Sequence, residues 1–299
     1  MSAALEGAAA ESFDALALDL GRFQLAHVEA FARLSRARGA SLEVAGSADA
    51  IAAVPSDVFR LTRVAAHAAD ADVKVFRTSG TTQGIAARGE HFFRTTSTYA
   101  AAALGWGERM LWPEGPGRAA IAVAVPPGEA EDSSLSFMID LFATAVAGPV
   151  TWHIDKRGLD NGGVERACVA ATAVGRPALV MGTALAFDAL CSVRPGAYAL
   201  PPGSRVMVTG GFKGSARQVS ADELYRSIAS AFAIPAACVI GEYGMTELSS
   251  QLYEAAWSGP GVYWPPPWLR VRAADPISLD ALPFGEVGIA RFVDLANVD

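Results

Sequence analysis

Cysteine, charged side chains and long hydrophobic runs are all scarce in this sequence. Only three of the 299 residues are cysteines, Cys168, Cys191 and Cys238, and no two of them form a C-x-x-C pair. An odd number of widely spaced cysteines provides neither a disulfide framework nor the paired ligands of a zinc site. Such usage is typical of a reducing compartment, so the sequence predicts a cytoplasmic location.

The scarcity of basic charge excludes one class of partner. Charged residues make up 18% of the chain, and the formal net charge is −7. A nucleic-acid-binding protein needs clustered Lys and Arg to neutralise phosphates. Because the basic residues are scattered here, we do not expect a nucleic-acid partner.

No hydrophobic run approaches the roughly 18 residues that a membrane span requires. The run over residues 119–126 has only the length of a strand. Residues 1–6 lack the basic-then-apolar order of a secretory signal. Hydrophobic residues nevertheless make up 52% of the chain, which is ample for a large buried core. We therefore expect a soluble protein of one large domain or two small ones.

Helical and strand-like segments alternate along most of the chain. Residues 12–38 carry apolar side chains at helical spacing, with a capping residue at Ser12 and a stop at Gly39. Further helices are predicted over 95–110, 134–147 and 222–232, and strands over 73–77, 119–125, 150–154, 178–183, 205–211 and 238–240. This alternation predicts an α/β fold with parallel-rich sheets flanked by helices. Residues 1–72 form a helical lead-in, and residues 73–299 form the α/β core.

A hydroxyl-rich segment, Thr78-Ser79-Gly80-Thr81-Thr82-Gln83-Gly84, follows an apolar strand. Its glycines permit a tight turn that directs successive N–H groups at one point, and its hydroxyls suit phosphate oxygens. No Lys follows the second glycine, so a Walker-type ATPase or kinase is disfavoured. The alternative is an ordinary polar turn between a strand and a helix.

A second segment, Gly241-Glu242-Tyr243-Gly244-Met245-Thr246-Glu247, also follows a strand-like run. Open α/β sheets bind ligands at the carboxyl ends of their strands. A Tyr ring can stack on adenine, a Thr hydroxyl can contact phosphate, and a carboxylate can hold Mg²⁺. The alternative is the capped start of a helix, with Thr246 and Glu247 bonding to the backbone.

Weaker candidates accompany these two segments. Gly210 and Gly211 follow a strand and permit close approach of a flat ring or a phosphate, beside Lys213. His91 and His153 lie next to aromatic residues, which favours a packed structural role over a catalytic one. Cys238 precedes an apolar pair and is predicted to be a buried strand residue.

Taken together, the chain resembles the LuxE-type acyl-protein synthetases, which are long-chain-fatty-acid–protein ligases. They are a branch of the adenylate-forming, acyl-CoA synthetase-like superfamily. The resemblance extends over nearly the whole chain and rests on residues 13–24, 53–59, 76–82, 243–247 and 285–297. It implies the large domain of that superfamily, including a small β-barrel to which residues 257–292 would contribute.

The resemblance also implies ATP and Mg²⁺ as cofactors. Ser79, Thr81 and Thr82 would hold the β- and γ-phosphates within the loop completed by Thr78, Gly80 and Gly84. Gly210 and Gly211 would lie along the adenine, with Tyr243 stacked on it and Gly244 beside it. Thr246 would contact the α-phosphate, and Glu247 would be the Mg²⁺ ligand. Thr246 and Glu247 are thus the implied catalytic residues.

The implied reaction is attack of a fatty or other hydrophobic carboxylate on the α-phosphorus, with release of pyrophosphate. The acyl group would then pass to a thiol, which in the family gives an acyl-protein thioester for a fatty-acid reductase. An acyl-reductase or another acyl-acceptor protein is the implied partner. The acyl pocket would lie near Gly210 and Leu248.

Two departures from the family pattern leave alternatives open. Relatives place Gly and then a basic residue after the hydroxyl-rich loop, whereas here Gln83 precedes Gly84 and Arg88 comes later. The chain also ends at Asp299, before the segments that would hold the family's acceptor cysteine and the small lysine-bearing carboxy-terminal domain. One alternative is therefore a non-catalytic or partner-dependent nucleotide-binding module. Another is an aryl- or acyl-CoA ligase of the phenylacetate type.

Overall fold

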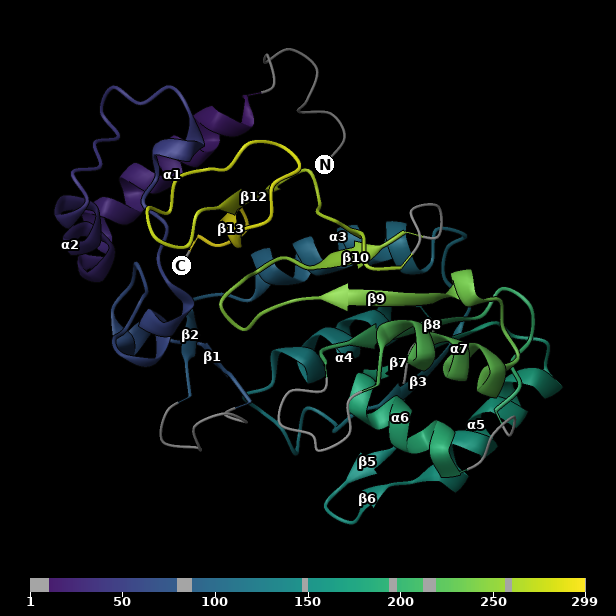
Figure 1. The fold of residues 1–299 in the computed structure, drawn as a ribbon. Coiled ribbons are helices and arrows are strands. Elements are labelled where there is room, and N and C mark those ends of the chain that lie inside the picture. Colours follow the sequence, from purple (N-terminus) through teal and green to yellow (C-terminus); the bar gives the residue numbers. More distant parts are fainter. Residues whose placement is uncertain are drawn as a thin grey trace.

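A seven-stranded sheet lies at the centre of the molecule, with helices on both faces (Figure 1). The computed structural model describes residues 11–79, 88–146, 150–193, 198–211, 219–255 and 260–298. In spatial order the strands are β11 (Tyr263–Trp264), β10 (Leu252–Glu254), β9 (Val239–Tyr243), β8 (Arg205–Thr209), β7 (Ala178–Thr183), β3 (Ala119–Val123) and β4 (Thr151–Trp152). Strands β9 to β4 pair in parallel, and β10 and β11 are antiparallel. The predicted α/β class with parallel-rich sheets is confirmed.

Both faces of this sheet are buried, because helices cover each of them. One face packs against α3 (Ser97–Leu111) and α4 (Ser134–Val146), and the other against α5 (Asn161–Ala173), α6 (Ala184–Val193) and α7 (Ala221–Phe232). In β7, Leu179 and Met181 belong to the first core, while Val180 between them belongs to the second. Burial on both sides explains why the strands read as continuous apolar runs.

The other described strands form three two-stranded antiparallel sheets. They are β1 (Lys74–Arg77) with β2 (Glu90–Phe93), β5 (Ile154–Asp155) with β6 (Gly158–Leu159), and β12 (Leu269–Ala274) with β13 (Ile289–Asp294). The expected barrel region, residues 257–292, supplies β11 to the large sheet. The rest of its described part forms β12 and most of β13. These two strands pair with each other as an antiparallel sheet and do not form a closed barrel by themselves.

The amino-terminal segment is helical, but it is broken where one helix was predicted. Two helices, α1 (Phe13–His27) and α2 (Glu29–Ala37), replace the single helix expected over 12–38. Val28 between them is extended, with φ −108° and ψ 97°, and is buried. A β-branched residue has a low helix propensity, so leaving the helix costs Val28 little free energy, and the break buries its side chain. Short 3₁₀ helices follow as η1 (Ala48–Ala50), η2 (Ser56–Arg60) and η3 (Ala69–Ala71).

Two strand predictions need correction. The strand expected over 150–154 is split: β4 pairs within the large sheet, while β5 turns away to pair with β6. Cys238 is half-buried in the 3₁₀ helix η5 (Ala236–Cys238) and precedes the strand instead of belonging to it. In the described part of the chain, none of the helices has the length and apolar character needed to cross a bilayer.

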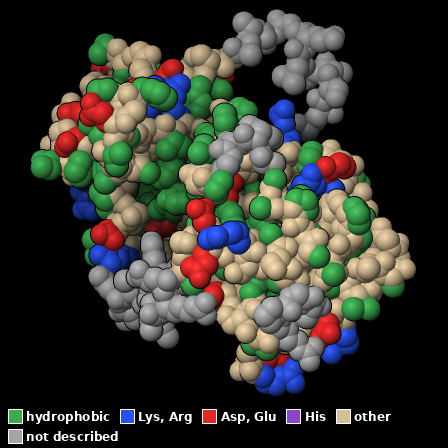
Figure 2. All heavy atoms as spheres, turned by 45° about the vertical axis from the view of Figure 1, so that its right-hand side comes forward, with side chains coloured by type: hydrophobic (Ala, Val, Ile, Leu, Met, Phe, Trp, Pro, Cys, Tyr) green, Lys and Arg blue, Asp and Glu red, His purple; other side chains and the backbone are tan. Residues whose placement is uncertain are grey.

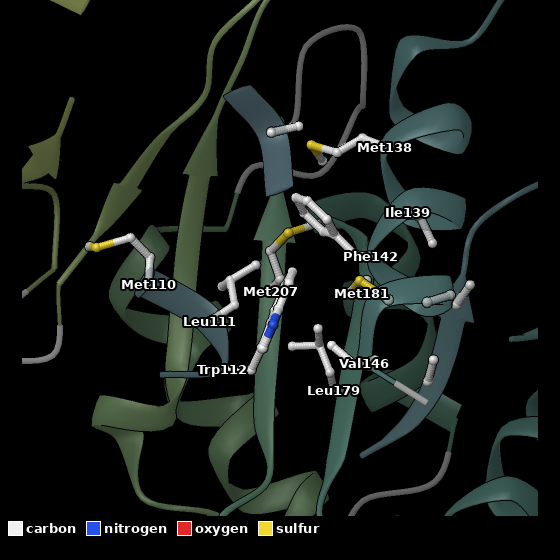
Figure 3. Close-up of a cluster of buried hydrophobic side chains, with 14 of the residues drawn as sticks. Met110, Leu111, Trp112, Met138, Ile139, Phe142, Val146, Leu179, Met181 and Met207 are labelled. Carbon is white, nitrogen blue, oxygen red and sulfur yellow. The ribbon is translucent and has the colours of Figure 1, made fainter. Parts of the chain in front are cut away.

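The core beneath α3 is tightly packed around one glycine. Figure 3 shows Trp112 and Phe142 among the methionines and leucines of this core, and their rings meet edge to face at 5.1 Å. A methyl group added at Gly107 would lie 2.8 Å from Phe142 Cζ and 3.3 Å from Trp112 Cη2. At Gly105, in the same helix, the nearest atom would be Trp268 Cη2 at 3.8 Å.

We therefore expect Gly107→Ala and Gly105→Ala to have opposite effects. Alanine improves helix propensity by up to about 1 kcal/mol at either position. At Gly107 the overpacking cost of about 1–3 kcal/mol exceeds that gain, and the Tm should fall by about 2–4 °C. Gly105→Ala should leave the Tm unchanged or raise it. Thermal unfolding of both variants measures this, and equal shifts would contradict the packing argument.

Candidate functional site

The glycine pair and the aromatic segment leave the sheet side by side. In the parallel pairing of β8 with β9, Thr209 lies opposite Glu242. Gly210-Gly211 and Tyr243 therefore emerge at the same edge, the carboxyl end at which open α/β sheets bind ligands. Gly210 has a φ of +70°, and a methyl group added to either glycine would meet no atom of the described residues within 4 Å. Neither glycine is therefore covered by the part of the chain that the structure describes.

The Tyr243 ring is partly supported and partly available. It stacks on Phe292 of β13 with an interplanar angle of 22° and a centroid distance of 6.0 Å, and the edge of Tyr263 contacts it at the same distance. The ring is 39% exposed, so part of its surface can accept a ligand. Burial and the charges of Glu247 and Glu242 raise the pKa of the Tyr243 phenol, which therefore stays neutral at physiological pH.

The chain after Gly244 makes a turn and does not begin a helix. The Leu248 N–H donates to the Met245 carbonyl at 3.1 Å, which places Thr246 and Glu247 at the centre of the turn. Both side chains are half-buried. The alternative interpretation, in which these two residues cap a helix, is wrong.

The hydroxyl-rich segment follows β1 in the sequence, and of its residues the structure describes Thr78 and Ser79. The next described element is β2, which pairs with β1. Thr78 N–H donates to the Gly89 carbonyl at 3.0 Å, and Gly89 N–H donates to Thr78 Oγ1 at 2.9 Å. Ser79 is exposed, while Gly80, Thr81, Thr82 and Gly84 lie outside the described residues. The base of the loop is therefore closed and well defined.

An arginine that was given no role from sequence braces this base. Arg88 donates from Nε to the Thr78 carbonyl and from Nη1 to Asp132 Oδ2 at 2.7 Å. Asp132 follows β3, so the bond ties the hairpin to the central sheet region. No local signal identifies the pair, because 44 residues separate them.

The base of the hydroxyl-rich loop meets the Thr246–Glu247 turn at Gly89. A methyl group added at Gly89 would lie 3.3 Å from Thr78 Cγ2 and 3.6 Å from Glu247 Oε1. The structure thus brings the two predicted phosphate-binding segments together. Among the described residues, no cluster of three or more His, Cys, Asp or Glu side chains suits a metal. One carboxylate fits Mg²⁺, which is commonly held by one or two carboxylates together with substrate phosphates.

A cavity of about 570 Å³ opens beside this junction, between the amino-terminal helices and β13. In Figure 2, hydrophobic side chains gather around a hollow in the left-hand part of the molecule. The lining includes Leu20, Val28, Phe31, Phe59, Leu248 and Phe292, and its polar members include His91, Glu247, Arg291 and Asp294. The acyl pocket was expected near Gly210 and Leu248; Leu248 lines this cavity, and Gly210 is not among its lining residues.

The cysteines do not contribute to the cavity. Burial raises the pKa of Cys168 to about 12 and that of Cys191 to about 11, so both are inert thiols at neutral pH. Cys238 also lies away from the lining residues. His153 is buried and bonded to Thr151 Oγ1 at 3.0 Å, in keeping with a structural role, and burial lowers its pKa.

A buried carboxyl group lies at the end of β9, directly before Tyr243. Glu242 is 5% exposed and accepts a hydrogen bond from the Thr209 hydroxyl. Burial raises its pKa to about 7, and the Thr209 bond opposes only part of that shift. The folded chain therefore holds this proton more tightly than the unfolded chain does.

This residue makes stability depend on pH. Its contribution is fully present below pH 4.5, the ordinary carboxyl range, and is lost as the pH rises towards 7. Since one pKa unit is about 1.4 kcal/mol, the loss is on the order of 3 kcal/mol. Glu242→Gln should therefore be more stable than wild type at pH 8 and lose this advantage near pH 5. Denaturant unfolding across that range tests this, with exposed Glu108→Gln as the control. Parallel curves for all three proteins would contradict it.

Comparison with known proteins gives a fold but not a family. No protein-family model matches the sequence, and no curated protein matches it either.

Solved structures do match. A 2-hydroxyisobutyryl-CoA ligase, in an open conformation with 2-HIB-AMP and CoA, has a TM-score of 0.71 and 15% identity, covering 95% of this chain and 60% of its own. MatB from Rhodopseudomonas palustris, with ATP bound, has a TM-score of 0.54 and 16% identity, covering 79% of this chain and 42% of its own. The chain thus spans about 60% of the first protein and less of the second. It shares the α/β fold of the matched parts of these two proteins.

Proposed function

We propose that this chain uses ATP to activate a hydrophobic carboxylic acid as an acyl-adenylate. One observation supports the proposal above all others: Glu247 Oε1 lies beside Gly89, next to Thr78 at the base of the hydroxyl-rich loop. A triphosphate held by the loop would therefore lie within reach of a Mg²⁺-binding carboxylate. The shared fold with ligases that bind ATP or an acyl-adenylate adds support.

The nucleotide would lie along the carboxyl edge of β8 and β9. A glycine pair without side chains, uncovered by the described residues, suits the close approach of a flat base, and the exposed part of Tyr243 offers a surface for stacking. Thr78 and Ser79, with Gly80, Thr81, Thr82 and Gly84 of the same loop, would bind the β- and γ-phosphates. Gly244 would let the backbone pass close to the nucleotide.

Thr246 and Glu247 would act at the reacting centre. The Thr246 hydroxyl would bind the α-phosphate and Glu247 would ligate Mg²⁺, which neutralises phosphate charge when bound. An oxygen of the substrate carboxylate attacks the α-phosphorus, and the bond from that phosphorus to the bridging oxygen of pyrophosphate breaks. The protein contributes orientation and fixed charge more than a nucleophile of its own.

The cavity favours a hydrophobic acid. Its volume of about 570 Å³ falls within the 300–1,000 Å³ typical of small-molecule sites. Its apolar wall begins at Leu248, next to Glu247, so an acid activated at the Thr246–Glu247 turn could extend its tail between α1, α2 and β13. A fatty acid is the substrate class that such a wall suits best.

A thiol would receive the acyl group in the second step. Its sulfur attacks the acyl carbonyl, AMP departs with the shared oxygen, and the thiol proton passes to solvent. Cys168 is buried and Cys191 is half-buried, and the raised pKa of each makes it a poor acceptor, which favours a thiol of another molecule. We propose a protein cysteine, as in the LuxE-type synthetases, and coenzyme A is the alternative.

Glu247→Gln tests the proposed chemistry directly. The wild-type chain should exchange pyrophosphate into ATP only when a suitable acid and Mg²⁺ are present. Loss of the carboxylate removes fixed charge at the reacting phosphates and should lower the exchange rate about 100-fold or more. The exposed Glu108→Gln variant should exchange like wild type. An unchanged rate in Glu247→Gln would contradict the assignment.

The same assay separates the competing functions. ATP binding without exchange, for any fatty or aryl acid, would favour the nucleotide-binding module over the enzyme. Exchange followed by product formation that requires coenzyme A would favour a ligase of the phenylacetate type. Product formation with an acyl-acceptor protein, and without coenzyme A, is the outcome expected here.

Filling the cavity should discriminate between acids by length. Ala290 lines the cavity, is exposed, and shares the face of β13 that carries Phe292, so Ala290→Trp is compatible with folding. Excluding about two methylene groups costs about 1.6 kcal/mol and should weaken binding of long acids about tenfold. Binding of short acids and of ATP should be unchanged. Displacement of a fluorescent fatty acid measures this, with exposed Val174→Trp as the control. Equal weakening for all acid lengths would exclude the cavity as the acyl site.

A further inference from the structure

A buried histidine contacts the turn that carries the two proposed catalytic residues. His91 of β2 is 1% exposed and packs against the rings of Phe59 and Phe93, at centroid distances of 5.7 and 4.2 Å. Its Nδ1 donates to the Thr246 carbonyl at 2.8 Å, across 155 residues of sequence. Its Nε2 lies 3.0 Å from Asn297 Oδ1.

Asn297 contacts the next carbonyl of the same turn. Its Nδ2 donates to the Glu247 carbonyl at 3.2 Å, and its own main-chain carbonyl accepts a bond from Gln24 Nε2 of α1 at 3.0 Å. His91 and Asn297 therefore hold two consecutive peptide oxygens. We call this pair of side chains, with their bonds to Thr246 and Glu247, the carbonyl clamp.

The clamp fixes the direction in which the Glu247 side chain leaves the backbone. The turn's own hydrogen bond uses the Met245 carbonyl and the Leu248 N–H. It leaves the two central carbonyls, those of Thr246 and Glu247, without a role in closing the turn. Bonds to both carbonyls fix the orientation of the two peptide planes that flank the Glu247 Cα. That orientation sets the direction of the Glu247 Cα–Cβ bond, from which the carboxylate extends.

The direction so fixed brings Glu247 Oε1 next to Gly89 and hence to Thr78. Gly89 and His91 belong to the same hairpin arm, so the element that carries the loop base also anchors the turn. The hairpin and the turn thus keep a constant relative position through His91. Asn297 adds a second anchor from the chain that follows β13.

We propose that His91 and Asn297 are positioning residues that hold the Glu247 carboxylate in the orientation needed to bind Mg²⁺ with the nucleotide. Neither side chain needs to contact the substrate. The part that concerns Mg²⁺ rests on the proposed function, whereas the clamp itself is a property of the protein alone.

Hydrogen–deuterium exchange of the segment 244–250 tests the clamp without any ligand. His91→Gln and Asn297→Ala should each raise exchange in this segment about tenfold, because each loses a bond to the turn. Asn297 is half-buried, so Asn297→Ala should disturb folding less and still tests the clamp if His91→Gln folds poorly. His153→Gln and Asn161→Ala are the matched control substitutions elsewhere in the chain. They should leave the exchange rate of segment 244–250 unchanged. Unaltered exchange in both clamp variants, or an equal rise along the whole chain, would overturn the proposal.

Binding of ATP as a function of Mg²⁺ concentration tests the positioning role. A fluorescent ATP analogue should require about tenfold more Mg²⁺ for half-maximal binding in the clamp variants than in wild type. Affinity for the analogue without metal should be equal in all variants. If exchange rises in the clamp variants but the Mg²⁺ concentration for half-maximal binding does not change, the clamp does not position Glu247 for Mg²⁺. If wild type itself fails to bind ATP with Mg²⁺, the proposed function is wrong, and the exchange measurement still decides the clamp.

Discussion

The parallel pairing of β8 with β9 is the constraint on which the rest of the candidate site depends. Because Thr209 lies opposite Glu242, the glycine pair and Tyr243 leave neighbouring strands at one edge. Both faces of these strands are buried, with Met207 in one core and Val206 and Val208 in the other. A slip of one residue would exchange those faces, so packing fixes the register. The position of the turn at Thr246 follows from that register.

Much of the fold could be predicted because its strands and helices carry strong local signals. The buried strands read as apolar runs, and α3, α4 and α7 carry helical periodicity. Helix α6 was missed because it continues directly from β7, so that residues 178–193 form one apolar stretch without a boundary. Helix α5 was not predicted because two glycines, which have low helix propensity, lie in its first turn. The break at Val28 depends on burial by distant residues, which local spacing does not encode.

The candidate site was predictable only in its separate parts. The hydroxyl-rich loop and the Tyr243–Glu247 segment have distinctive compositions, so the sequence suggested them as binding elements. Their meeting at Gly89 is a tertiary contact, and neither segment predicts it alone. His91 was assigned a packing role, which its burial supports, but its bond to Thr246 spans 155 residues. Asn297 gives no local signal, because only its contact with the turn distinguishes it from an ordinary polar residue.

The contact between His91 and Asn297 also bears on how the protein is made. These residues are 206 positions apart, so their contact is strongly non-local. During synthesis from the amino terminus, the hairpin emerges long before Asn297, and the Glu247 carbonyl gains its bond to Asn297 only after residue 297 has left the ribosome. The carbonyl clamp is therefore completed late in synthesis, after the hairpin and the turn have been made.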